Sequence, residues 1–204
     1  MTQNTRATIV LGTNNRKKGL ELAELVTPLG LQVRTLADFD GVQEVAETGE
    51  TFAANAALKA TQYARQLDHW VLADDSGLCV DALDGRPGVH SARYAGPTAG
   101  DEDNNDRLLN ELAGAPLDKR TAHYVCHVTL ADPTGAIRAE AEDSCHGRIL
   151  FERHGAGGFG YDPLFEIVEY HRSFGELSPE VKACLSHRAR ALRKILPEIR
   201  RLLA

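Results

Sequence analysis

Hydrophobic residues in the first half of the chain form short apolar runs that are separated by helically spaced positions. Leu22, Leu25 and Val26 recur at the three- and four-residue intervals of a helix, which should stop near Gly30. The predicted elements are a strand at 7–11, a polar loop at 12–18, a helix up to Gly30, a strand at 32–35, a helix at 51–67 and a strand at 70–73. This order of strands and helices predicts an α/β layered fold.

The second half differs, because two β-like runs are joined there by a turn. Residues 120–131 and 136–144 flank Asp132-Pro133-Thr134-Gly135, which is a hairpin signal and implies an antiparallel lobe. The helices predicted in this half are one around 104–112, a short one that Ser178 caps, and a last one that Ser186 caps and Pro197 kinks.

Composition and charge narrow the class of protein. With 204 residues, 43% hydrophobic and 25% charged, the chain is expected to be a soluble globular protein with one domain at 1–204. A net charge of −6 argues against a nucleic-acid surface, which usually carries a basic patch. There is no apolar run of about 18 residues and the polar start does not resemble a signal peptide, so we expect no membrane partner and a cytoplasmic location.

The four cysteines lie far apart in the sequence and do not form a closely spaced pair of the kind that binds zinc. The doublets Cys126-His127 and Cys145-His146 fall in β-like runs, where neighbouring side chains point to opposite faces. Each doublet is therefore expected to split, and we predict buried free thiols at Cys79, Cys126, Cys145 and Cys184 in place of a zinc site.

Asp74 and Asp75, followed by Ser76 and Gly77, come at the end of the apolar run at 70–73. The end of a buried strand is where open α/β sheets place their ligand chemistry. Two adjacent carboxylates repel each other and lose hydration on burial, so a positive partner is expected, and Mg²⁺ prefers such oxygen ligands. A solvated turn is the alternative, because all four residue types are common in turns.

Other segments combine features that suit a phosphorylated or aromatic ligand. The loop 12–18 joins a strand to a helix and carries three basic residues, which favours an anion at the helix start. The segment 155–160 matches a dinucleotide fingerprint only formally, because Pro163 follows where a helix would be needed, and its aromatic neighbours could stack on a base. Residues 186–188 gather donors, and Glu47 precedes a helix. Each segment has a structural alternative. The loop 12–18 could be a solvated helix start, 155–160 a glycine loop with core aromatics, and 186–188 a cluster of surface charges.

Seven short segments, taken in order and with their spacing, resemble the inosine/xanthosine triphosphate pyrophosphatase family over nearly the whole chain. Members of that family hydrolyse aberrant purine nucleoside triphosphates to the monophosphate and pyrophosphate. Each segment alone is a weak signal, but seven in order are a strong one. The segments are Thr13-Asn14-Asn15-Arg16-Lys17-Lys18, Glu47-Thr48-Gly49-Glu50-Thr51-Phe52, Asn55-Ala56-Ala57-Leu58-Lys59-Ala60, Ala73-Asp74-Asp75-Ser76-Gly77-Leu78, Pro87-Gly88-Val89-His90-Ser91-Ala92-Arg93-Tyr94, Gly157-Gly158-Phe159-Gly160-Tyr161-Asp162-Pro163 and Ser186-His187-Arg188.

The resemblance implies a two-lobed α/β fold with a mixed sheet and a central nucleotide-binding cleft, a homodimer, and Mg²⁺ as cofactor. Glu47, Asp74 and Asp75 would hold the metal, and Asp75 would be the general base. The substrate-binding residues implied by position are Thr13, Asn15, Lys18 and Lys59 toward the triphosphate, with Asn14, Arg16 and Lys17 in the same loop, Ser76 toward the nucleotide, and Phe159, Gly160, Tyr161, Asp162, Lys182, His187 and Arg188 around the purine base.

The reaction implied by this resemblance is attack of water on the α-phosphorus of ITP, dITP or XTP, with Asp75 taking a proton. A donor such as His187 or Arg188 would recognise the 6-oxo group of the base. Three rival interpretations stay open: a pyrophosphatase for another modified nucleotide such as a pyrimidine, a catalytically silent nucleotide sensor, and a protein-interaction domain. Mg²⁺-dependent release of pyrophosphate from inosine triphosphate would separate the first interpretation from all three.

Overall fold

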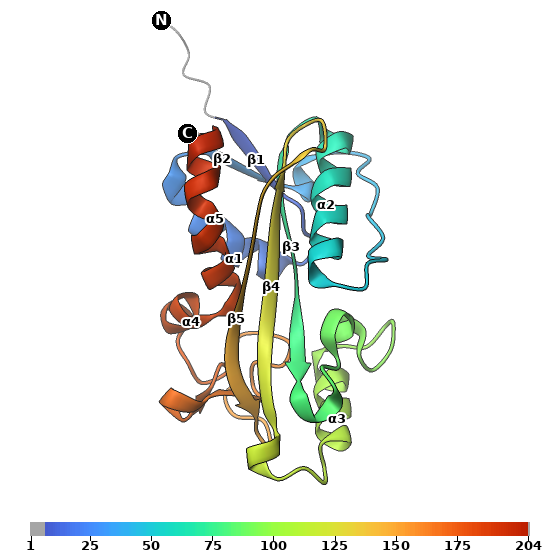
Figure 1. Ribbon diagram of the computed structural model, residues 1–204, viewed down its shortest axis with the longest axis vertical. Coiled ribbons are helices and arrows are strands. Elements are labelled where there is room, and N and C mark those ends of the chain that lie inside the picture. Colours follow the sequence, from blue (N-terminus) through green and yellow to red (C-terminus); the bar gives the residue numbers. More distant parts are fainter. Residues whose placement is uncertain (1–6, 204) are drawn as a thin grey trace, which may run out of the picture. The chain divides into compact units, whose positions relative to one another are not determined.

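A computed structural model describes residues 7–203 and contains a mixed sheet with helices packed on it (Figure 1). In sheet order, the strands are β2 (Gln32–Thr35), β1 (Thr8–Leu11), β3 (Trp70–Val80), β4 (Thr121–Ala131), β5 (Ile137–Ile149), β6 (Phe165–Ile167) and β7 (Arg172–Ser173). The α-helices are α1 (Arg16–Val26), α2 (Phe52–Leu67), α3 (Asp101–Glu111), α4 (Pro179–Leu185) and α5 (His187–Leu203).

The predicted order of elements is confirmed, and so is the mixed α/β fold class. β1 runs parallel to both β2 and β3, with Ile9 opposite Val33 on one side and Trp70 on the other. β6 is antiparallel to β5 and to β7. The turn at 132–136 joins the neighbouring strands β4 and β5, as the hairpin signal predicted. Pro197 lies inside α5, where the expected kink stays a prediction.

The expectation that Asp74 and Asp75 close their strand is wrong, and the alternative of a solvated turn is wrong as well. β3 continues through both carboxylates to Val80. The strand stays in the protein interior beyond them, because Leu78 and Val80 are completely buried in a second hydrophobic core. A polar interruption of an apolar run was therefore not the end of the strand.

The chain folds into two compact units. The first comprises residues 7–75, Cys126–Asp143 and 188–203 of the described part, and the second comprises Ser76–Val125 and Ser144–His187. The expectation of a single domain over the whole chain, and that of a central cleft, stay predictions.

The first unit has helices on both faces of its strands (Figure 1). On one face, Ile9, Leu11 and Leu72 pack with the buried residues of α1 and α5. On the other face, Val71 and Ala73 pack with buried residues of α2, together with Val10 of β1. Because successive side chains of a strand alternate between faces, this pattern also decides where the residues after Ala73 point.

The second unit has a core that is rich in aromatic side chains. The rings of Tyr124 and Phe165 lie 4.7 Å apart between centroids, and those of Phe165 and Phe174 lie 5.4 Å apart. Leu108 of α3 is completely buried in the same core. Arg120 is also buried, and its guanidinium donates to three main-chain carbonyls, those of Ile149, Leu112 and Leu150.

The cysteines differ partly from the expectation of buried thiols. Cys126 and Cys145 are buried, but Cys79 is only partly buried and Cys184, on α4, is exposed. The Cys126-His127 doublet does split, since the thiol lies beside Asp74 while the imidazole faces Glu140. None of the helices within residues 7–203 is long and apolar enough to cross a membrane.

Candidate active site

Strand alternation sends Asp74 and Asp75 of β3 to opposite faces of the first unit. Asp74 lies on the face of Leu72, toward α1 and α5, and is 0% exposed. Asp75 lies on the face of Ala73, toward α2, and is 5% exposed. Two carboxylates that are adjacent in the sequence therefore have separate surroundings.

Asp74 is surrounded by positive charge. Arg188 of α5 donates from Nε to Asp74 Oδ2 at 3.1 Å, and Lys18 Nζ of α1 lies 3.8 Å from the same oxygen. Burial alone would raise the pKa of Asp74, but attraction by Lys18, Arg188 and Lys59 outweighs burial and holds that pKa well below its usual range. Arg188 is itself buried and also pairs with Glu21 of α1. Asp74 is thus an ionised member of a buried charge network at neutral pH.

Asp75 has the opposite setting. Asn55 of α2 donates to Asp75 Oδ2 at 3.1 Å, and Lys59 Nζ lies 3.6 Å from Oδ1. Burial raises the pKa of Asp75, and the attraction of Lys59 and Lys18 offsets only part of that effect. A pair of carboxylates whose pKa values are driven apart is a common basis for dividing acid–base roles. Asp75 is the member of the pair that is suited to accept a proton.

Asn55 is a site residue that was missing from the predicted set. Its side chain is completely buried and also accepts a hydrogen bond from the Gly49 N–H at 2.8 Å. A Cβ atom on Gly49 would come within 2.7 Å of the Asn55 amide oxygen, so the loop that carries Glu47 can approach α2 only with glycine there. The signal that could have found Asn55 is its spacing from Lys59, because residues four apart share one helix face.

The predicted metal ligands are only partly brought together. Glu47 Oε1 lies 2.7 Å from Lys59 Nζ, the same ammonium that Asp75 contacts, whereas Asp74 lies on the other face of the strand. Within residues 7–203, the structure contains no cluster of three or more His, Cys, Asp or Glu side chains arranged to hold a metal. Mg²⁺ commonly takes one or two carboxylates and completes its shell with water and substrate phosphates. Glu47 and Asp75 fit that donor set, and the assignment of Asp74 stays a prediction.

The loop before α1 is held by its own side chains. Asn15 caps the helix, because its Oδ1 accepts from the N–H groups of Lys17 and Lys18 at 3.0 and 3.2 Å. Thr13 Oγ1 in turn accepts from the Asn15 N–H. Two of the N–H groups expected to attract an anion are thus already engaged. The exposed residues of the predicted phosphate loop are Asn14, Asn15, Arg16 and Lys17.

In the second unit, the structure brings together three of the residues predicted around the base. Lys182 Nζ of α4 lies 2.7 Å from Asp162 Oδ2, and both side chains are buried. The same oxygen accepts the Phe159 N–H at 2.7 Å, and the ammonium lies 4.5 Å from the centroid of the Phe159 ring. A Cβ atom on Gly158 would lie 2.0 Å from this carboxylate, and its φ is +76°, so the loop requires glycine there.

Other predicted base contacts are packed into the core of this unit. Tyr161 is 3% exposed and its hydroxyl donates to the Ser91 carbonyl at 2.8 Å. The His187 ring is buried and stacks on Tyr124 with centroids 4.6 Å apart. Phe159 is the aromatic residue of the loop that stays partly exposed, and Ser76, which follows Asp75 in β3, is also partly exposed.

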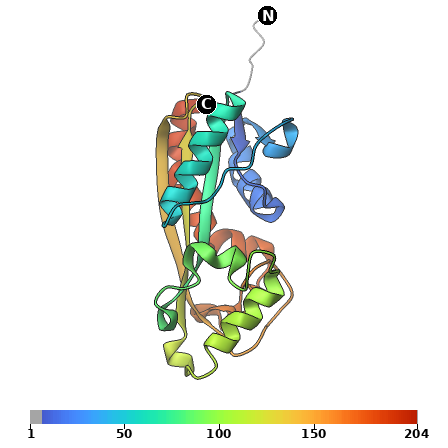
Figure 2. The same ribbon diagram turned by 90° about the vertical axis from the view of Figure 1, so that its right-hand side faces the viewer.

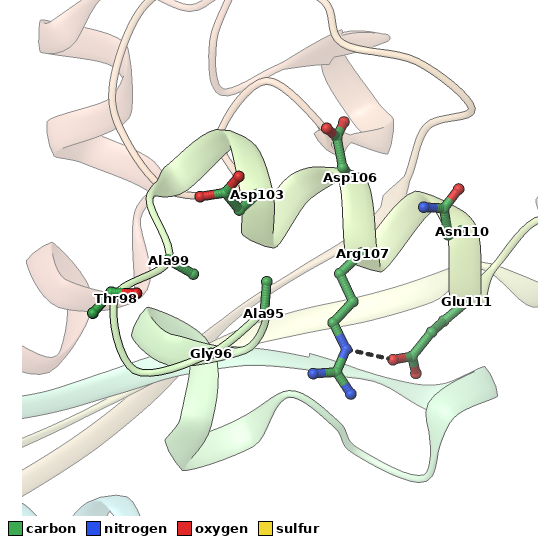
Figure 3. A pocket seen from close by; sticks show the side chains of 9 residues that line it. All are labelled: Ala95, Gly96, Thr98, Ala99, Asp103, Asp106, Arg107, Asn110 and Glu111. Carbon is green, nitrogen blue, oxygen red and sulfur yellow. Dashed lines mark hydrogen bonds and ion pairs between the residues drawn. The ribbon is translucent and has the colours of Figure 1, made fainter.

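A cavity of about 640 Å³ in the second unit contains none of the predicted site residues (Figure 3). It lies between α3 and the segment 95–99, and Arg107 pairs with Glu111 in its wall. The carboxylates of Asp103 and Asp106 make the rest of the α3 side acidic. An acidic wall does not suit a triphosphate, so this cavity is not assigned to the substrate.

Comparison with known proteins identifies the family. A model of the Ham1 family matches residues 9–198. The chain belongs to the Ham1 family. It is 53% identical to a dITP/XTP pyrophosphatase of Rhodopirellula baltica, over 95% of this chain and 93% of that protein, and 51% identical to one of Desulforamulus reducens, over 95% and 96%. A HAM1 protein structure from Coxiella burnetii has a TM-score of 0.85 and 37% identity, covering 93% of this chain and 96% of that one. The family resemblance of the sequence is thereby confirmed.

In this Ham1-family protein, Asp74→Asn should reduce stability far more than Asp75→Asn. The first change removes the carboxylate that faces buried Arg188, and breaking a buried ion pair costs on the order of 3 kcal/mol. The second removes a charge that burial already disfavours, so its effect on the free energy of unfolding should stay below about 1 kcal/mol. Urea unfolding at neutral pH measures both variants, and equal losses would contradict the assignment.

The same comparison has a defined pH dependence. The pKa of Asp74 is lower in the folded protein than in the unfolded chain, so its contribution to stability is present above the unfolded value of about 3.9. That contribution is lost as the pH falls below this value and the carboxylate becomes protonated. The stability difference between wild type and Asp74→Asn should therefore shrink when urea unfolding is repeated in progressively more acidic buffer.

Proposed function

We propose that this chain is a nucleoside triphosphate pyrophosphatase that hydrolyses dITP, XTP and ITP to the nucleoside monophosphate and pyrophosphate. The observation that carries the proposal is its identity of 53% and 51% to relatives named dITP/XTP pyrophosphatases, matched nearly from end to end. The arrangement of charges in the first unit supports hydrolysis of a phosphoanhydride bond. Removal of these triphosphates would cleanse the nucleotide pool.

Asp75 is the proposed general base. One of its oxygens accepts from Asn55 and the other faces Lys59, so the carboxylate is held in one orientation. Its raised pKa makes it a better proton acceptor than an ordinary aspartate. In the proposed reaction, water attacks the α-phosphorus while Asp75 takes its proton. The bond from the α-phosphorus to the bridging oxygen breaks, and pyrophosphate leaves with the electron pair.

The lysines of the first unit are the proposed phosphate contacts. Lys59 is buried beside Glu47 and Asp75, and its pKa is raised because the nearby carboxylates outweigh the effect of burial. Lys59 therefore stays charged at neutral pH, and Lys18 supplies a second ammonium group, 3.8 Å from Asp74 Oδ2. Fixed cations of this kind stabilise the charge that develops on a leaving pyrophosphate.

Mg²⁺ is the proposed cofactor, and Glu47 and Asp75 are the residues that would hold it. When bound, it would neutralise phosphate charge and orient the triphosphate chain. The donor set supports this choice, because two carboxylates that both face one ammonium retain capacity for a hard cation. Lys59 would then balance the remaining negative charge.

Base recognition is proposed to depend mainly on the second unit. Phe159 offers a partly exposed ring there, and the buried pair of Asp162 and Lys182 fixes the loop behind it. Arg188, which the family resemblance assigns to the base, is engaged by Asp74 and Glu21 in the first unit. We therefore expect replacement of Arg188 to reduce the hydrolysis of all substrates to a similar degree.

We further propose that the protein acts as a homodimer in the cytoplasm, which light scattering and cell fractionation can test.

The first test is the reaction itself. The purified protein with Mg²⁺ should release pyrophosphate from dITP and XTP much faster than from dATP or dGTP. In water enriched in ¹⁸O, mass spectrometry should find the label in the monophosphate, because water attacks the α-phosphorus. Label in pyrophosphate, or release of single phosphates, would contradict the proposed bond cleavage.

Asp75→Asn should reduce kcat for dITP by roughly 10²–10⁴-fold, the usual contribution of a general base. Glu24→Gln is a matched control, because Glu24 is an exposed carboxylate on α1 of the same unit. Circular dichroism should show both variants folded. An Asp75→Asn protein that keeps more than about a tenth of the wild-type kcat would exclude Asp75 as the base.

Removal of the metal should abolish turnover. Glu47→Gln should raise the Mg²⁺ concentration needed for half-maximal activity by roughly tenfold, because loss of a group that supports a metal usually weakens metal binding on that scale. Glu44→Gln changes an exposed carboxylate in the same loop and should leave that concentration unchanged. If excess Mg²⁺ does not restore the Glu47→Gln protein, Glu47 acts through Lys59 and not as a ligand.

A further inference from the structure

The backbone of Gly160, in the glycine-rich loop, is held on both sides of its Cα by the same helix. The Gly160 N–H donates to Asp101 Oδ2 at 2.8 Å, and the Gly160 carbonyl accepts from Asn105 Nδ2 at 3.1 Å. Asp101 and Asn105 are four residues apart at the start of α3, so they share one helix face. Gly160 itself has φ of +61°, a conformation that few other residues adopt without strain.

The two contacts differ in burial. Asn105 is 0% exposed, and a buried amide of this kind is costly unless it is hydrogen-bonded. Asp101 is exposed in the first turn of α3, where the helix dipole favours a negative side chain. Removing either side chain leaves one of the two peptide groups that flank Gly160 without the contact that holds it.

The position of Gly160 controls the residues on both sides of it. Phe159 precedes it and Asp162 follows shortly after, and the two are joined in a tight turn. The Phe159 N–H donates to the Asp162 side chain, and the Asp162 N–H donates to the Phe159 carbonyl at 3.2 Å. A shift of the Gly160 backbone would therefore move the Phe159 ring and the carboxylate that pairs with Lys182.

A second connection ties the same helix to the start of the loop. Arg153 pairs with Glu102 at 2.8 Å and with Asp106 at 2.6 Å, two residues that are also four apart on α3. These carboxylates are 76% and 66% exposed, so the pairs contribute little to binding geometry or stability. The Gly160 contacts are the ones that can transmit a structural constraint. Figure 2 shows α3 together with the other segments of the second unit.

We propose that Asp101 and Asn105 are positioning residues for base recognition. By holding the peptide groups before and after the Gly160 Cα, they fix Phe159 and Asp162 and so determine which purine ring the loop accepts. They act through the loop and do not take part in the chemistry at Asp75. The inference rests on the proposed function of the second unit in base recognition.

The chain offers a matched control for each residue. Asp103 is also in the first turn of α3, but its Oδ2 accepts the Gly100 N–H at 2.9 Å and not that of Gly160. Asn104 is buried like Asn105 and makes two hydrogen bonds, with Ala95 and Ala92. Asp103→Ala and Asn104→Ala therefore disturb the helix to a similar degree without releasing Gly160.

Two measurements are made on Asp101→Ala, Asn105→Ala and both controls. The first is kcat and KM, determined separately for dITP and for dGTP, and the second is hydrogen–deuterium exchange of the peptide that covers 155–164. For Asp101→Ala and Asn105→Ala, we expect KM for dITP to rise roughly five- to twentyfold, the scale of one hydrogen bond, with a smaller change in kcat. The preference for dITP over dGTP should narrow, and exchange at 155–164 should increase.

Asp101→Asn keeps an oxygen acceptor for the Gly160 N–H, so it should restore both the preference and the exchange protection. The inference is overturned if Asp101→Ala and Asn105→Ala change the dITP/dGTP ratio no more than the controls do, or if exchange at 155–164 stays at the wild-type level. Exchange does not depend on turnover. A wild-type protein that leaves dITP intact would therefore contradict the proposed function, while the exchange data would still decide whether α3 holds the loop.

Discussion

Two carboxylates in the middle of a buried strand can coexist only if the strand separates them, and the first unit depends on that constraint. Because successive side chains of β3 point to opposite faces, Asp74 lies on the side of α1 and α5, and Asp75 lies on the side of α2. The charged contacts of Asp74 and Asp75 follow from this separation onto two faces. Arg188 and Lys18 converge on one carboxylate, whereas the polar face of α2 and the loop at Glu47 converge on the other. A slip of one residue in the strand would exchange the two settings and place each carboxylate among the wrong partners.

The division has an electrostatic consequence. Asp74 is buried together with its cations, so its charge is compensated and its pKa is low. Asp75 has fewer compensating contacts and a raised pKa, although Lys59 is close to it. The network around Asp74 links α5 to α1 through Arg188, and the proposed chemistry belongs to its neighbour Asp75. A burial cost that looks unfavourable at Asp75 is the property that makes a carboxylate useful as a base.

The sequence was informative wherever local pattern decides the outcome. Helical spacing located α1 and α2, and the cap predicted at Ser178 lies where the structure has it. The end of β3 was misjudged, because an Asp pair looks like a turn when the cations that compensate it come from distant segments. Asn55 was overlooked for a similar reason. Its spacing links it to Lys59 on one helix face, but its hydrogen-bond partners, Gly49 and Asp75, lie in a loop and in a strand elsewhere in the sequence. Tyr161 is predicted beside the base from its place in the loop, but its burial and the hydrogen bond from its hydroxyl to the Ser91 carbonyl leave no signal in the sequence.

The glycine-rich loop shows why a motif alone does not specify a binding loop. Different neighbours require its glycines. A Cβ on Gly155 would lie 2.2 Å from the Gly175 backbone, whereas a Cβ on Gly158 would collide with Asp162. Gly160 has open space around a Cβ, so packing does not explain it. Its left-handed backbone and the two contacts from α3 do, because the N–H and the carbonyl of Gly160 both reach α3 from a residue with positive φ. The conformation of the loop is therefore set by a helix about fifty residues earlier in the chain, and a pattern of glycines identifies the loop without revealing what holds it.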